Sequence, residues 1–118
     1  MAQASILYEA REGVARITLN RPEVLNSFDG AMSRSLQQVL AEVAQDSTLR
    51  AVYLTGAGRA FCAGQDLGEA YGQSGRGAEG KGGSGGIADF AARVRNLYNP
   101  LVLALRRMPK PVVCAVNG

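Results

Sequence analysis

The stretch LTGAGRAFCAGQDL, residues 54–67, is the most informative part of this chain. It begins at the end of a short apolar run, residues 51–54, which indicates a buried strand. Small residues then interrupt the chain at 56–58 and again at 62–64, and Asp66 is suited to cap a following helix. Such a turn exposes backbone N–H groups beside a helix start, an arrangement that can stabilise an oxyanion or bind a phosphate.

Two other interpretations of this turn stay open from the residues alone. Gly56 and Gly58 follow a strand, as in a dinucleotide-binding turn, but Phe61 stands where that fingerprint needs its third glycine. No acidic residue closes a strand about 20 residues later, as the same fingerprint requires. The turn could also be purely structural, with its glycines at positive φ.

The size and charge of the chain limit the classes of function. Its 118 residues suffice for one small domain, and 47% hydrophobic with 19% charged residues is ordinary for a soluble protein. The net charge is +3 and the basic residues are scattered, so we predict no nucleic-acid partner. No apolar run reaches membrane-spanning length and residues 1–5 lack a signal-peptide pattern, so we expect a cytoplasmic protein without a membrane partner.

Histidine is absent, and this excludes several kinds of active site. Ser-His-Asp and Cys-His nucleophile systems cannot be built from these residues, nor can a His-ligated metal site. We therefore predict no metal, and any acid–base chemistry must use carboxylates, Tyr, Lys or backbone groups. Cys62 and Cys114 lie among small apolar residues, which predicts reduced cysteines in the core.

Periodicity predicts an α/β order of elements in the first half of the chain. Residues 6–10 and 14–19 read as two strands, joined by a tight hairpin at Glu12-Gly13. Apolar residues at helical spacing from Met32 to Val43 then predict an amphipathic helix before the strand at 51–54. Strand, helix and strand in this order form a crossover unit of an α/β fold.

The second half begins with an unusual segment. More than half of residues 72–86 are glycine, which predicts a mobile loop, either an inert linker or a flap over a ligand site. A second amphipathic helix follows over 87–108, interrupted or kinked at Pro100. Residues 112–116 form a continuous apolar run, as expected of a strand buried on both faces. The chain stops at the turn signal Asn117-Gly118, from which we expect a fragment of a longer domain.

Three motifs in succession resemble the crotonase (enoyl-CoA hydratase/isomerase) superfamily. They are NRPEVLNS at 20–27, the stretch at 54–67 with its specific core FCAGQDL, and PKPVVCAVNG at 109–118. Their order and spacing match, so the resemblance covers nearly the whole chain apart from the Gly-rich loop. QDL at 65–67 together with YNPLV at 98–102 is similar to the phenylacetate-pathway branch, which isomerises a ring-epoxide CoA thioester.

The resemblance implies a fold, a chemistry and an assembly. Residues 1–118 would be the N-terminal part of the crotonase spiral of ββα units, with the mobile loop at 72–86. The activity would be hydration or isomerisation of an acyl-CoA thioester, in phenylacetate catabolism or fatty-acid β-oxidation. Coenzyme A would enter as part of the substrate, with no separate cofactor, and full-length members of the family are homotrimers or hexamers.

The resemblance also implies particular site residues. The backbone N–H of Gln65 would be the first of two oxyanion-hole donors and would polarise the thioester carbonyl. The residues implied in contact with CoA are Val24, Leu25, Ala63, Gly64, Asp66 and Leu67. Leu25 and Leu67 could equally be packing residues, and Asp66 could act as a helix cap.

Two functions stay open at this point. In the family, the second donor and the acid–base carboxylate come after the position of Gly118, so we expect the 118-residue chain to be inactive by itself. The first hypothesis is therefore an enzyme of which this is a part. The alternative is a non-catalytic CoA-binding or interaction module.

Overall fold

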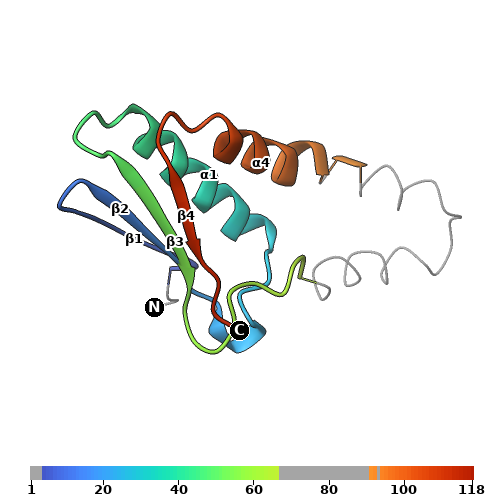
Figure 1. The fold of residues 1–118 in the computed structure, drawn as a ribbon. Coiled ribbons are helices and arrows are strands. Elements are labelled where there is room, and N and C mark those ends of the chain that lie inside the picture. The colour runs from blue at the N-terminus through green and yellow to red at the C-terminus, as the bar shows by residue number, and fades with distance from the viewer. Residues whose placement is uncertain (1–3, 67–90, 93) are drawn as a thin grey trace, which may run out of the picture.

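The protein forms one four-stranded sheet with helices against it (Figure 1). The structure, a computed structural model, describes residues 4–66, 91–92 and 94–118. The strands are β1 (Ile6–Arg11), β2 (Val14–Leu19), β3 (Ala51–Gly56) and β4 (Val112–Ala115), in the sheet order β1-β2-β3-β4. The helices are η1 (Pro22–Val24), α1 (Gly30–Gln45), η2 (Val94–Tyr98) and α4 (Asn99–Arg106). The Gly-rich segment 72–86 and Leu67 lie outside the described residues.

The hairpin and the crossover unit expected from the sequence are both present. β1 pairs with β2 antiparallel, and the turn between them places Glu12 and Gly13 at φ 53° and 79°. Two successive positive φ values are those of a type I′ turn, whose twist matches that of the strands. β2 and β3 are parallel and joined through α1, and β4 pairs parallel with β3. The α/β interpretation is thus confirmed.

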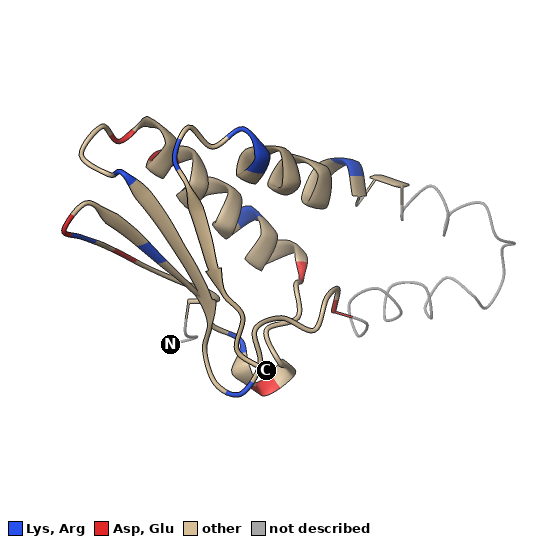
Figure 2. Cartoon of the chain, viewed as in Figure 1, with Lys and Arg blue, Asp and Glu red and all other residues tan. Residues whose placement is uncertain are grey.

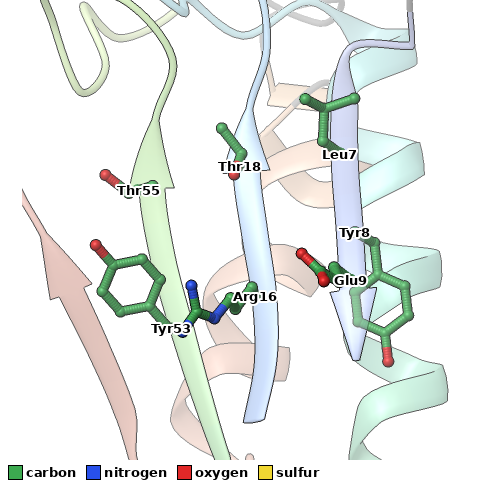
Figure 3. Close-up of a pocket in the computed structure, with 7 residues that line it drawn as sticks. All are labelled: Leu7, Tyr8, Glu9, Arg16, Thr18, Tyr53 and Thr55. Atoms are coloured by element: carbon green, nitrogen blue, oxygen red, sulfur yellow. The ribbon is translucent and has the colours of Figure 1, made fainter. Parts of the chain in front are cut away.

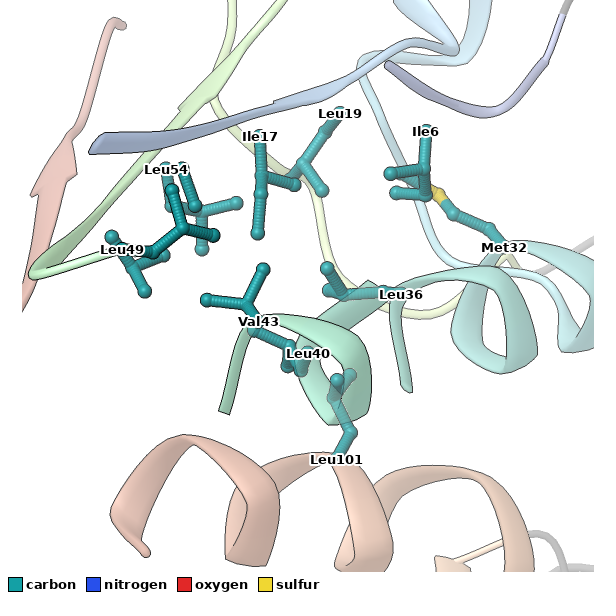
Figure 4. Close-up of a cluster of buried hydrophobic side chains, with 12 residues drawn as sticks. Ile6, Ile17, Leu19, Met32, Leu36, Leu40, Val43, Leu49, Leu54 and Leu101 are labelled. Atoms are coloured by element: carbon teal, nitrogen blue, oxygen red, sulfur yellow. The ribbon is translucent and has the colours of Figure 1, made fainter. Parts of the chain in front are cut away.

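The hydrophobic core lies between one face of the sheet and α1, and α4 packs beside α1 (Figure 4). Alternate residues of β2 and β3 point to this face, and α1 meets them with a stripe at helical spacing. The most completely buried large side chains of the core are Ile17, Leu19, Met32, Leu36, Leu40, Val43 and Val52. Asp29 caps α1, because its carboxylate accepts a hydrogen bond of 2.8 Å from the Met32 N–H.

The second face of the sheet is open and carries both polar and apolar side chains (Figure 3). Glu9, Arg16 and Tyr53 are cross-strand neighbours on β1, β2 and β3, and Thr18 lies opposite Thr55. Elsewhere in the described chain, Lys and Arg are spread over both layers rather than gathered in one stripe (Figure 2). Among the helices that the structure describes, none is long and apolar enough to cross a bilayer.

Pro100 is accommodated by a change of helix type. The turn before it, η2, is a π-helix, and Pro100 then occupies the first turn of α4, where its missing N–H removes no helical hydrogen bond. The Leu97 carbonyl accepts hydrogen bonds from the Ser33 hydroxyl and from the Gln37 amide of α1. The side chains of α1 thus satisfy a carbonyl at the irregular turn, and the apolar stripe continues into buried Leu101.

The expectation that residues 112–116 form a strand buried on both faces is wrong. Val113 is 58% exposed and Val116 66% exposed. Cys114 is exposed as well, so its assignment to the core is also wrong, whereas Cys62 is partly buried against the core. β4 is an edge strand in the sheet of the described residues, and the open face of that sheet carries no second layer there.

Lys110 stabilises the C-terminal end of α1. Its ammonium group donates hydrogen bonds to the Val43 carbonyl and, at 2.5 Å, to the Asp46 carbonyl. A cation is favourable here because the last carbonyls of a helix lack helical partners and carry partial negative charge. We expect Lys110→Met to lower the free energy of unfolding by about 1–2 kcal/mol in urea titrations. Arg34→Met, which removes an exposed cation from the first half of the same helix, is the matched control, and equal losses in both variants would contradict this role.

Candidate active site

Asn26 organises the loop between β2 and α1. Its side chain is fully buried, with an exposed fraction of 0%. The carboxamide Nδ2 donates to the carbonyls of Ala57 and Ala60 at 2.9 and 2.8 Å, and Oδ1 accepts from the Arg21 N–H at 2.7 Å. The residue itself has a positive φ of 57°, a conformation that asparagine tolerates better than most. One side chain therefore joins the 20–29 loop to the glycine turn after β3.

Asn117, two residues after the end of β4, binds the same turn. Its Nδ2 donates to the carbonyls of Gly56 and Gly58 at 2.9 and 3.0 Å. Gly56 is enclosed so tightly that a Cβ there would lie 2.5 Å from the Phe61 carbonyl oxygen. Only glycine fits without a shift of the backbone, because such a contact lies inside van der Waals distance. The glycine turn is thus held between two asparagine carboxamides.

The backbone N–H of Gln65 has its direction set by the neighbouring loop. Residues 28 and 65 form a parallel bridge, in which the Phe28 N–H donates to the Gly64 carbonyl at 2.7 Å. The Gly64 carbonyl and the Gln65 N–H belong to one trans peptide, so they point in opposite directions. The N–H is therefore directed away from Phe28, and no group of the described residues accepts a hydrogen bond from it.

An open hollow of about 360 Å³ lies beside this peptide. Its lining is mostly apolar and consists of Phe28, Gly64, Gln65, Val94, Tyr98 and Leu101. The loop before α1, the segment after β3 and the η2–α4 helices each contribute residues to it. A backbone donor at the edge of an apolar hollow is suited to a substrate with a carbonyl oxygen and a hydrophobic group.

The residues predicted to contact CoA lie mainly on the two neighbouring loops. The Ala63 N–H donates to the Leu25 carbonyl at 3.0 Å, and Val24 is 37% exposed on the same loop. Gly64 lies beside Gln65 at the hollow. The carboxylate of Asp66 accepts a hydrogen bond of 3.0 Å from the Arg21 guanidinium. Leu67 and the helix that Asp66 was expected to cap lie outside the described residues.

The sequence interpretation assigned no role to several residues that build the site. Asn26 and Asn117 hold the glycine turn, and Phe28 and Tyr98 line the hollow. Asn26, Asn117 and Tyr98 fall within quoted motifs, so motif membership was the available signal. Their partners lie tens of residues away in the chain, and periodicity carries no information on such contacts.

Comparisons with known proteins show the family of the chain. The model of the family described as enoyl-CoA hydratase/isomerase matches residues 9–118. The chain is 46% identical over 113 residues to 1,2-epoxyphenylacetyl-CoA isomerase of Escherichia coli (strain K12). The matched region covers 96% of this chain and 40% of that protein. It is 42% identical over 118 residues to a probable enoyl-CoA hydratase of Rhodobacter capsulatus, covering 100% of this chain and 40% of the relative.

Solved structures give the same result. The crystal structure of a putative enoyl-CoA hydratase/isomerase from Mycobacterium abscessus superposes with a TM-score of 0.82 at 38% identity, covering 96% of this chain and 40% of that one. The chain thus spans about 40% of the length of these relatives. The expected likeness to part of the crotonase fold is confirmed, and the chain belongs to the enoyl-CoA hydratase/isomerase family.

Proposed function

We propose that this chain supplies the thioester-binding side and one oxyanion-hole donor of an acyl-CoA isomerase or hydratase. The observation that carries the proposal is the direction of the Gln65 N–H. The Phe28–Gly64 hydrogen bond turns this N–H away from Phe28, and Gln65 lines an apolar hollow. Coenzyme A enters as part of the substrate, and no separate cofactor or metal is proposed.

The chemistry needs a fixed donor at this place. Abstraction of a proton next to a thioester carbonyl, or attack of water on a conjugated alkene, moves negative charge onto the carbonyl oxygen. A preorganised N–H opposes that charge without reorienting, and loss of one such donor typically costs about 3 kcal/mol of barrier. The Gly64 carbonyl already accepts a hydrogen bond, which polarises the shared peptide and strengthens Gln65 as a donor.

The acyl group that we propose is cyclic or aromatic. Phe28 and Tyr98 both line the hollow, and flat rings pack well against aromatic side chains. The relative at 46% identity is named as an isomerase of 1,2-epoxyphenylacetyl-CoA, which supports a place in phenylacetate catabolism rather than β-oxidation. We further propose a cytoplasmic location and a trimeric or hexameric full-length protein, as in the family.

The second candidate function is a CoA-binding module without catalysis. No carboxylate is among the described residues that line the hollow, so the described chain offers no acid–base group of that kind there. This favours binding without turnover for the 118-residue chain.

Calorimetry and activity assays with the 118-residue chain test both functions. We expect phenylacetyl-CoA to bind more tightly than butyryl-CoA, and no turnover of crotonyl-CoA or of a 3-enoyl-CoA. Absence of binding to any of these thioesters would overturn the proposed function. Turnover by the isolated chain would instead exclude the non-catalytic alternative.

A further inference from the structure

Arg21 joins the loop before α1 to the segment after β3 through one guanidinium group. Nη1 donates to the Ser27 carbonyl at 2.7 Å, and Nη2 donates to the Asp66 carboxylate at 3.0 Å. A second carboxylate, that of Asp29, lies 3.5 Å from Nη1. The side chains of Arg21 and Asp66 are only 18% and 19% exposed, so solvent screens this ion pair less than one on the surface.

The ion pair spans the bridge that sets the direction of the Gln65 N–H. Phe28 donates to the Gly64 carbonyl and accepts from the Asp66 N–H, each at 2.7 Å. Arg21 binds the residue before Phe28 through Ser27 and the residue after Gln65 through Asp66. It therefore holds both sides of the bridge, one residue away from each of its members.

The peptide that Arg21 restrains has freedom to turn. Gly64 has a φ of 105°, and a Cβ built there would meet nothing within 4 Å. Gly64 has no side chain, and no neighbouring atom packs closely where one would be, so packing does not hold its backbone in place. Its orientation depends on two hydrogen bonds: its N–H donates to the Cys62 Sγ at 3.4 Å, and its carbonyl accepts from the Phe28 N–H at 2.7 Å. The second bond depends on the two loops staying in register.

We propose that Arg21 is a positioning residue for the oxyanion donor. By pairing with Asp66 and Ser27 it keeps the 25–28 and 63–66 segments in register and so fixes the direction of the Gln65 N–H. The catalytic role of Arg21 rests on the proposed function. The contacts of Arg21 with Ser27 and Asp66, which we call the clamp, exist without a ligand. We expect a lysine to substitute poorly, because the contacts to Ser27 and Asp66 use two separate nitrogens of the planar guanidinium fork, whereas a lysine has one compact ammonium.

Hydrogen exchange in the ligand-free chain tests the clamp. In Arg21→Met we expect the Phe28 and Asp66 amides to exchange at least tenfold faster, because the bridge opens more often. The Val52 amide, which donates to the Pro111 carbonyl in the sheet, should be unchanged, and so should all three amides in the control Arg34→Met. Unchanged exchange at Phe28 and Asp66, or equal acceleration at Val52, would overturn the inference.

Vibrational spectroscopy of a bound thioester tests whether the contacts of Arg21 affect the Gln65 N–H as a donor. Crotonyl-CoA labelled with ¹³C at its carbonyl should show a lowered C=O stretching frequency when bound to the wild-type chain, and a smaller shift when bound to Arg21→Met. Arg21→Lys should restore little of the shift. An equal shift in all three proteins would contradict the positioning role. No shift in the wild type would count against the proposed function instead, while the exchange result still decides the clamp.

Should Arg21→Met fail to fold, Asp66→Asn gives the same test from the other side. It keeps the shape of the side chain and removes only the negative charge, so we expect a weaker acceleration of exchange, several-fold, at Phe28 and Asp66. Exchange at the wild-type rate in this variant would overturn the inference.

Discussion

Replacing Asn26 with leucine is expected to lower the free energy of unfolding by about 3–5 kcal/mol. The substitution keeps the size of the side chain but leaves three backbone groups without their partner, the Arg21 N–H and the carbonyls of Ala57 and Ala60. Each buried polar group left unpaired costs about 1–3 kcal/mol. The sum is a large part of the roughly 5–15 kcal/mol by which a domain is stable, so the variant should be close to unfolding. Urea titration followed by circular dichroism measures the loss.

Two further variants test whether the loss of stability comes from the buried hydrogen bonds of Asn26. Asn20→Leu removes a single exposed hydrogen bond to the Ala4 carbonyl, so its cost should stay below about 1 kcal/mol. Asn26→Asp keeps an acceptor for Arg21 but faces the two carbonyls of the turn with a carboxylate, and it should destabilise as strongly as leucine. If Asn26→Leu cost no more than Asn20→Leu, water would be replacing the lost partners and the structural role of Asn26 would be refuted.

The regular elements could be predicted because their signals are local. The alternation over 14–19 and the helical spacing from Met32 to Val43 each follow from which side of one element faces the core. The hairpin was equally readable, since Glu12-Gly13 carries a turn preference in two residues. Such patterns depend on neighbours in the chain, and the structure confirms them.

The site was predictable only in outline. The glycine turn at 56–58 indicated a backbone site, but its supports come from far along the chain: Asn117 is 61 residues from Gly56, and Arg21 is 45 residues from Asp66. Which carboxamide meets which carbonyl depends on how the elements pack, and composition does not contain that information. The same reason explains the error at Cys114. An apolar run predicts burial, but exposure depends on whether another layer covers that position.

The largest expected effect on catalysis comes from Gln65→Pro. Proline lacks a backbone N–H, so the variant removes the proposed oxyanion donor and nothing else that the structure shows to be bonded at that nitrogen. In the full-length protein we expect kcat for isomerisation of a 3-enoyl-CoA to fall by about 10²–10³-fold, the usual effect of losing one such donor. KM should change much less, because the donor acts mainly on the charge of the transition state.

Gln65→Ala is the matched control for this experiment. It removes the side chain but keeps the N–H, so we expect kcat close to that of the wild type. Exchange rates of the Phe28 and Asp66 amides should be similar in both variants, because both bridge hydrogen bonds use atoms that proline leaves in place. If alanine and proline lowered kcat equally, the side chain of Gln65 would be the active group. A near wild-type rate in Gln65→Pro would exclude this N–H from the mechanism, because proline at position 65 has no backbone N–H to donate.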